Sequence, residues 1–150
     1  MSHEHYSLLL KQAEALIQSE SDFIANTANL ASLVFNNLEN VNWAGFYLLR
    51  NNELVLGPFN GQVACTRIPV GKGVCGTAFE KQETFVVGDV HAFDGHIACD
   101  AASESELVVP FTTKDFRGVL DIDSPVFNRF GDAEKALFEG LVELLEQQHT

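Results

Sequence analysis

The chain has 150 residues, and its hydrophobic residues, 46% of the total with 12 Phe among them, can form one buried core. We therefore expect residues 1–150 to form a single domain. Acidic residues outnumber basic ones by 21 to 9, which gives a formal net charge of −12 and disfavours nucleic acid and anionic membranes as partners. Residues 76–150 hold 15 of the acids and 5 of the bases, so a site in this half should favour cationic ligands.

No hydrophobic run approaches the ~20 residues of a membrane span. The N-terminal segment carries polar residues at helical intervals instead of a signal-peptide core, so we expect a cytoplasmic protein. Three cysteines, Cys65, Cys75 and Cys99, are an odd number for a secreted disulfide scaffold. They are either inert core thiols or redox-active ones.

Two amphipathic helices are predicted at the start of the chain. Hydrophobic residues recur at three- and four-residue steps over residues 6–17 and again over residues 24–38. Ser21 and Asp22 precede the second segment and are candidate caps.

A β-hairpin should follow the helices. Residues 43–49 and 54–59 are rich in aromatic and branched side chains, and residues 50–53 between them suit a turn. Glycines then interrupt the middle of the chain, residues 61–102, which we interpret mainly as structured loop. Loops of that length are often functional.

Regular structure returns toward the C-terminus. A short helix is expected near residues 76–81 and a strand at 84–87, followed by paired strands at 107–112 and 118–123. A final helix should follow Asp132. Because short turns join neighbouring strands, we predict an antiparallel sheet with helices gathered on one side, the α+β class.

The cysteine spacing does not indicate a metal site. Cys65, Cys75 and Cys99 form no CxxC or zinc-ribbon pattern, and His91 and His96 add no common zinc spacing, so neither a metal nor a cofactor is expected. An isolated cysteine is ordinarily a small buried side chain. All three nevertheless lie in or beside the glycine-rich middle, and thiols on loops can exchange between thiol and disulfide.

Paired acids are the next candidates for a site. Strand alternation places Asp121 and Asp123 on one face of the predicted strand 118–123, and Glu104 with Glu106 forms a second alternating pair. The face is either solvated or the floor of a pocket that binds an ammonium group or shares a proton, because close carboxylates raise one another's pKa.

An aromatic pair is the last candidate. Trp43 and Tyr47 are four residues apart in a predicted strand and therefore share a face. They are either core residues or a wall around a small apolar group.

Four segments together resemble a known family: NWAGFYLL (42–49), LVLGPFNGQVACTRIPVGKGVCGTA (54–78), DVHAFDGHIACDAASESELVVP (89–110) and GVLDIDSP (118–125). They closely resemble the free methionine-(R)-sulfoxide reductases, small enzymes built on a GAF domain. The resemblance covers most of the chain from Asn42 to about Phe130 and includes all three cysteines, the paired acids and the aromatic pair in one order. It implies a central antiparallel sheet of about six strands with helices packed on it.

The resemblance also implies roles for the site residues. It makes Cys99 in HIACD the nucleophile, Cys65 the favoured resolving thiol and Cys75 a second thiol that assists. It makes thioredoxin the reductant and places the enzyme among the defences against oxidative stress. The implied substrate-binding residues, for the ammonium and the sulfoxide methyl group, are Trp43, Tyr47, Glu106, Asp121 and Asp123.

The chemistry agrees with these roles. A thiol must attack the sulfoxide sulfur while a proton reaches the oxygen, so Cys99 needs a protonated carboxyl group nearby. The resulting sulfenic acid condenses with Cys65 to a disulfide. Neighbouring acids, Asp100 included, should raise the pKa of Cys99 and keep the resting thiol protonated.

Other readings stay open. The acids would favour free methionine-(R)-sulfoxide, because its α-ammonium is absent from a peptide. A GAF-type sensing module without catalysis would need the acids and aromatic residues but no thiols. A metal-binding or structural thiol protein is a further alternative. GAF domains commonly dimerise through helices, and the terminal helices here offer hydrophobic stripes for a homodimer.

Overall fold

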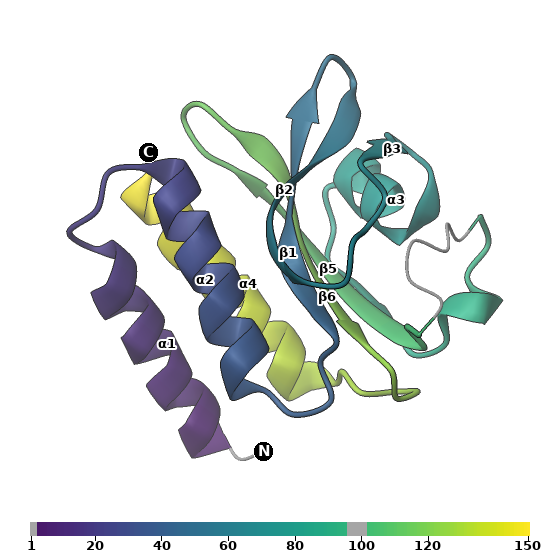
Figure 1. Cartoon of the computed structure of the whole chain (residues 1–150), viewed down its shortest axis with the longest axis horizontal. Helices are drawn as coiled ribbons and strands as arrows, with labels where there is room; N and C mark the ends of the chain where they lie inside the picture. Colours follow the sequence, from purple (N-terminus) through teal and green to yellow (C-terminus); the bar gives the residue numbers. More distant parts are fainter. Residues whose placement is uncertain (1–2, 96–101) are drawn as a thin grey trace.

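Three layers make up the fold of a computed structural model that describes residues 3–95 and 102–150 (Figure 1). Helices α1, α2 and α4 cover one face of a sheet, and α3 covers the other. The elements in chain order are α1 (His3–Ile17), α2 (Phe23–Asn37), β1 (Trp43–Arg50), β2 (Glu53–Gly61), β3 (Arg67–Pro69), α3 (Gly73–Lys81), β4 (Phe85–Val87), the 3-10 helix η1 (Val90–Ala92), β5 (Ser105–Thr112), β6 (Arg117–Ser124) and α4 (Asp132–Gln148).

The sheet has six strands in the order β3-β2-β1-β6-β5-β4, and every neighbouring pair is antiparallel. This confirms the predicted α+β class and the GAF-type sheet. Strand β3 and helix η1 were not expected from the sequence, because three residues are too few to show a period. Strands β1 and β6 lie at the centre of the sheet, so their side chains form the middle of each face.

Local sequence explains two of the element ends. Asp22 caps α2 by accepting a hydrogen bond from the backbone N–H of Ala25 at 2.8 Å, as the sequence predicts. The β1–β2 hairpin turns through Asn51 and Asn52, whose φ angles of 51° and 67° suit asparagine. Arg50 and Glu53 pair across the strands, so the turn is two residues shorter than the predicted 50–53.

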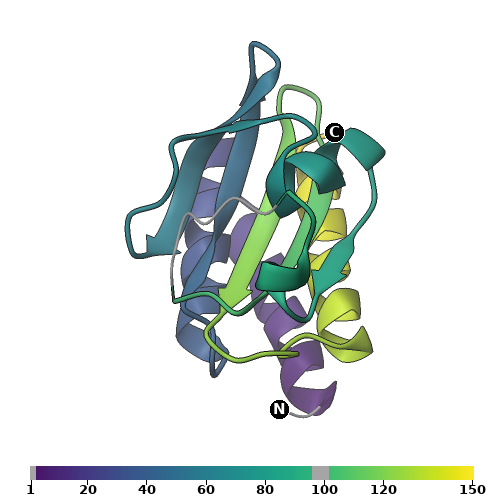
Figure 2. The same ribbon diagram turned by 90° about the vertical axis from the view of Figure 1, so that its right-hand side faces the viewer.

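Both faces of the central strands are buried, which requires two hydrophobic cores. Phe46, Leu48 and Ile122 pack against α1, α2 and α4, whereas Tyr47 and Val119 pack under α3. The expectation that the helices gather on one side is therefore wrong for α3. Figure 2 shows α3 in front of the sheet, and it contacts β5 and β6.

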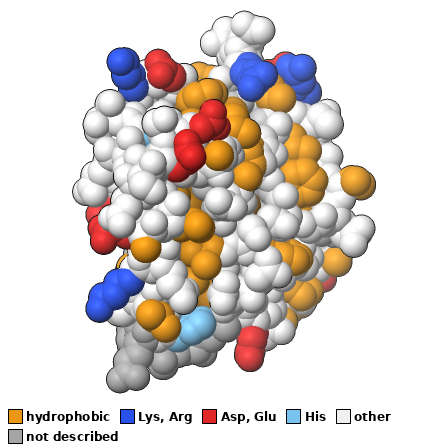
Figure 3. Space-filling model, turned by 60° about the vertical axis from the view of Figure 1, so that its left-hand side comes forward, with side chains coloured by type: hydrophobic (Ala, Val, Ile, Leu, Met, Phe, Trp, Pro, Cys, Tyr) orange, Lys and Arg blue, Asp and Glu red, His pale blue; other side chains and the backbone are white. Residues whose placement is uncertain are grey.

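The helical side also presents hydrophobic surface. Figure 3 shows this side, where exposed hydrophobic side chains lie among uncharged groups with some acidic side chains beside them. Leu8 and Leu16 of α1 are 54% and 39% exposed, and Ile24 of α2 is 45% exposed. Among the residues described, no helix combines the length and the apolar character needed to cross a bilayer.

Candidate active site

Three acidic side chains meet on the face of the sheet that α3 covers. Asp121 and Asp123 alternate along β6 on this face, as predicted, and Glu106 of β5 lies directly opposite Asp123. All three are buried, with 5%, 8% and 8% of their surface exposed for Asp121, Asp123 and Glu106. The acidic pair therefore lies on a buried face of the sheet and not on a solvated one.

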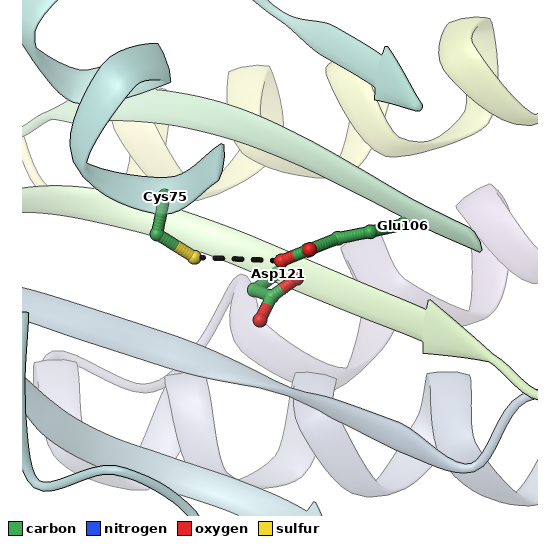
Figure 4. Close-up of side chains that lie close together, drawn as sticks. All are labelled: Cys75, Glu106 and Asp121. Carbon is green, nitrogen blue, oxygen red and sulfur yellow. Dashed lines mark hydrogen bonds between the residues drawn. The ribbon is translucent and has the colours of Figure 1, made fainter. Parts of the chain in front are cut away.

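Cys75 joins this cluster from α3, the helix that covers this face of the sheet. Its thiol donates a hydrogen bond to Oε2 of Glu106, with an S···O distance of 3.7 Å, and it is free and buried (Figure 4). The sequence grouped Cys75 with loop thiols outside the core, and the structure corrects this. Because α3 begins at Gly73 instead of near residue 76, Cys75 falls in the first turn of the helix and faces the sheet.

Burial and like charge control protonation in the cluster. Burial raises the pKa of Asp121 well above its ordinary value, and the charges of Asp123 and Glu106 raise it further. Burial also raises the pKa of Cys75, with Asp121 and Glu106 acting in the same direction. The arrangement therefore keeps the Cys75 thiol protonated at neutral pH and favours the protonated form of the Asp121 carboxyl group.

The predicted aromatic pair borders the acids. Trp43 lies opposite Asp123 in the β1–β6 register, and its ring stacks against that of Tyr47 with centroids 5.9 Å apart. Both side chains are 2% exposed, so they are core residues that also face the acidic cluster. The indole N–H donates to the Gln62 carbonyl at 3.1 Å, which fixes the ring.

Phe59 of β2 extends this wall, and sequence reasoning missed it. Its ring stacks on Trp43 with centroids 5.2 Å apart. The strand register explains its place: Phe59 pairs with Gly45, whose missing side chain leaves room for the ring. This pairing is visible only in the structure. A Cβ at Gly45 would lie 2.3 Å from the Cβ of Phe59.

Comparison with known proteins identifies the family. Residues 25–147 match the GAF domain family. The chain is 52% identical over 145 residues to the free methionine-R-sulfoxide reductase of Escherichia coli, covering 96% of this chain and 88% of that protein. The chain belongs to the free methionine-R-sulfoxide reductase family.

Solved structures agree with the family assignment. The chain superposes with a TM-score of 0.91 on fRMsr of Staphylococcus aureus in complex with substrate, at 53% identity over 97% of this chain and 95% of that chain. It also superposes, with a TM-score of 0.94, on a putative GAF sensor protein from Burkholderia vietnamiensis at 52% identity over 99% of this chain and 96% of that one.

Of the other two cysteines in this reductase-family chain, the structure describes Cys65 but not Cys99. Cys65 follows β2, is partly exposed and is disulfide-bonded, and its backbone carbonyl accepts a hydrogen bond from the Tyr47 hydroxyl at 2.8 Å. Cys99 lies outside the described residues. Its expected position beside Asp121 and Asp123 therefore stays a prediction.

Glu104 does not join the acidic cluster. It precedes β5, and its Oε2 lies 3.0 Å from Nε2 of His91 in a partly exposed hydrogen bond. Of the second predicted pair, Glu106 alone reaches the cluster of described acids. The reason is that β5 begins at Ser105, so strand alternation governs Glu106 but not Glu104.

Proposed function

We propose that this protein reduces free methionine-(R)-sulfoxide to methionine with a cysteine thiol. The observation that carries the proposal is the buried carboxylate cluster beside an aromatic wall, in a chain that belongs to the reductase family. Glu106, Asp121 and Asp123 can hold an ammonium group, while Trp43 and Tyr47 can contact the sulfoxide methyl group.

Recognition of the free amino acid follows from charge. A cation that enters the cluster replaces the protons that otherwise relieve the repulsion between its carboxylates. Methionine inside a polypeptide has a neutral amide at this position, so it cannot make the same ion pair. We therefore propose free methionine-(R)-sulfoxide as the substrate and expect peptide-bound sulfoxide to react poorly.

The reductive step requires a nucleophile and an acid. The Cys99 sulfur attacks the sulfoxide sulfur, and a protonated carboxyl group of the cluster supplies hydrogen to the oxygen. In net terms the oxygen moves from the substrate to Cys99, which releases methionine and leaves a sulfenic acid. The raised pKa of Asp121 supports a carboxyl group that is protonated before reaction.

Turnover then needs a second thiol and an external dithiol. The Cys65 thiol condenses with the Cys99 sulfenic acid, releasing water and forming a disulfide. Cys65 is the better candidate for this step than Cys75, because Cys65 is disulfide-bonded whereas the Cys75 thiol is free and donates to Glu106. We propose thioredoxin, in the cytoplasm, as the dithiol that reduces this bond.

An assay on the separated epimers of free methionine sulfoxide tests the function. With thioredoxin and its reductase, or with dithiothreitol, only the R epimer should be consumed, and Cys99→Ser should abolish turnover while the variant retains the wild-type melting temperature. The N-acetylated R epimer should react far more slowly than the free amino acid. Equal consumption of both epimers, or full activity of folded Cys99→Ser, would contradict the proposal.

A sensing module without catalysis is the second candidate, favoured by the similarity to the Burkholderia vietnamiensis protein. A sensor would bind the amino acid through the same acids and aromatic side chains. It would show affinity for methionine sulfoxide in calorimetry but no consumption of either epimer with any dithiol.

A further inference from the structure

Cys75, Glu106 and Asp121 form a compact group of potential metal ligands. One ligand atom from each lies within 4.8 Å of the other two, and the sulfur lies 3.7 Å from Oε2 of Glu106 (Figure 4). Tetrahedral zinc, with Zn–S near 2.3 Å and Zn–O near 2.0 Å, holds sulfur and oxygen ligands about 3.5 Å apart. The sulfur-to-Oε2 distance therefore already fits the ion, and the carboxylate of Asp121 lies near enough to complete the set with a small side-chain adjustment.

A second observation points to a missing ligand. Oδ1 of Asp121 is buried and has no hydrogen-bond partner among the described residues, and the side chain belongs to a residue only 5% exposed. A buried polar atom without a partner is costly. The carboxylate of Asp121 lies beside Cys75 and Glu106, so an ion bound between these three groups would give this carboxylate a partner.

We propose that Zn²⁺ binds between Cys75, Glu106 and Asp121. One thiolate and two carboxylates leave a fourth position for water, the arrangement of an open zinc site. Three anionic ligands and one Zn²⁺ sum to a single negative charge, so the ion removes most of the repulsion in the cluster. The thiolate favours zinc over magnesium and calcium, which prefer oxygen ligands.

The ion and the amino acid would exclude one another. Glu106 and Asp121 are also the groups assigned to the substrate ammonium, and this step alone rests on the proposed function. Zinc is then an inhibitor that acts by occupying the ammonium position.

The test uses the full chain with Cys65→Ser and Cys99→Ser, which leaves Cys75 as its single thiol. Titration with Zn²⁺ alone in a calorimeter should show one saturable site. Co²⁺ in place of zinc should give a thiolate-to-cobalt charge-transfer band. Adding Cys75→Ala should remove the band and weaken zinc binding by about tenfold or more, while Glu104→Gln, a carboxylate outside the cluster, should change neither.

The carboxylates are tested in the same background. Glu106→Gln and Asp121→Asn should each weaken zinc binding, and saturating free methionine should lower the apparent zinc affinity. Absence of saturable binding, or binding that survives Cys75→Ala, would overturn the site. Unchanged zinc affinity with methionine present would overturn mutual exclusion.

Failure of this inference is distinguishable from failure of the proposed function. If the wild-type chain reduces the sulfoxide but the single-thiol variant does not bind zinc, only the proposed metal site is excluded. If the single-thiol variant binds zinc but the wild-type chain reduces no sulfoxide, only the proposed reductase function is excluded.

Discussion

At the scale of single residues, the Tyr47 hydroxyl joins the aromatic wall to the segment that carries Cys65. It donates a hydrogen bond to the Cys65 carbonyl at 2.8 Å. Burial, with the charges of Asp121 and Cys75, raises the pKa of Tyr47 far above its ordinary value, so the group remains a donor. Tyr47 therefore holds the backbone of the segment that carries Cys65 in addition to facing the acidic cluster.

Tyr47→Phe should keep the ring and lose this bond. We expect about 0.5–1.5 kcal/mol of lost stability, the usual net value of one hydrogen bond. Disulfide formation after one turnover should also slow, which thiol counting at timed intervals would show. A variant with wild-type stability and wild-type disulfide formation would contradict a positioning role.

Gly45 is required by the close approach of two strands. Its added Cβ would lie 2.3 Å from the Cβ of Phe59 and 2.8 Å from the Trp43 ring. Gly45→Ala should therefore destabilise the fold by about 1–3 kcal/mol and weaken substrate binding by moving the wall. Urea denaturation and the KM for the R epimer measure the two effects.

Gly131→Ala is the matched control for this substitution. The nearest atom to its added Cβ, Oε1 of Glu134, lies at an ordinary 3.5 Å. Gly131 is the N-cap of α4, where alanine is a poorer cap, so the change should cost about 0.5–1 kcal/mol and leave the KM unchanged. Equal losses in the two variants would indicate a general glycine effect instead of a clash.

At the scale of elements, the first turn of α4 is tied to α1 through Glu134. The Tyr6 hydroxyl donates to its Oε2 at 2.6 Å, and the Gly131 N–H donates to its Oε1 at 2.7 Å. Burial alone would raise the pKa of Glu134, but these hydrogen bonds and the Arg129 charge outweigh it and lower the pKa below its ordinary 4.5. The ionised side chain therefore stabilises the contact of α4 with α1.

This contact should depend on pH. Because the folded-state pKa is depressed, the stabilisation is fully present above pH 4.5 and is lost as pH falls through the lower folded value. Glu134→Gln should reduce the free energy of unfolding by about 1 kcal/mol at pH 7, and the difference from wild type should shrink below pH 4. Chemical denaturation across pH 3–7 measures it, and a constant difference would refute the linkage.

At the scale of the whole molecule, α1 has hydrophobic residues on two sides. Leu9, Ala13 and Ile17 are buried against the domain, whereas Leu8 and Leu16 are exposed and lie about two turns apart along the helix. Such residues suit contact with a second copy of the chain.

We predict a homodimer that Leu8→Glu with Leu16→Glu converts to a monomer. Light scattering after size-exclusion chromatography distinguishes the two states. The matched control is Val86→Glu, an exposed residue on the edge strand β4 and not on helix α1, which should leave the dimer intact. A wild-type monomer at all concentrations would exclude this interface.

Much of this architecture was predictable because hydrophobic periodicity reflects burial. The helices at both ends of the chain, the β1–β2 hairpin and the shared face of Asp121 and Asp123 all follow from local spacing. Helix α3 was only partly predictable. The predicted helix starts near Gly76, whereas the observed one begins at Gly73. A Cβ at Gly76 would lie 2.4 Å from the Pro69 carbonyl, so close packing requires this glycine inside a helix.

The amino-acid sequence by itself determined the element types, the GAF-type fold and the set of chemically able residues, since these depend on local periodicity and on motifs. Only the tertiary structure decided which acids form one cluster. Glu106 joins Asp121 and Asp123, while Glu104 pairs with His91. Cys75 reaches the acids from α3, which lies on the opposite face of the sheet from α1, α2 and α4. Strand register and helix docking are set by packing between residues far apart in the chain, and no local pattern encodes them.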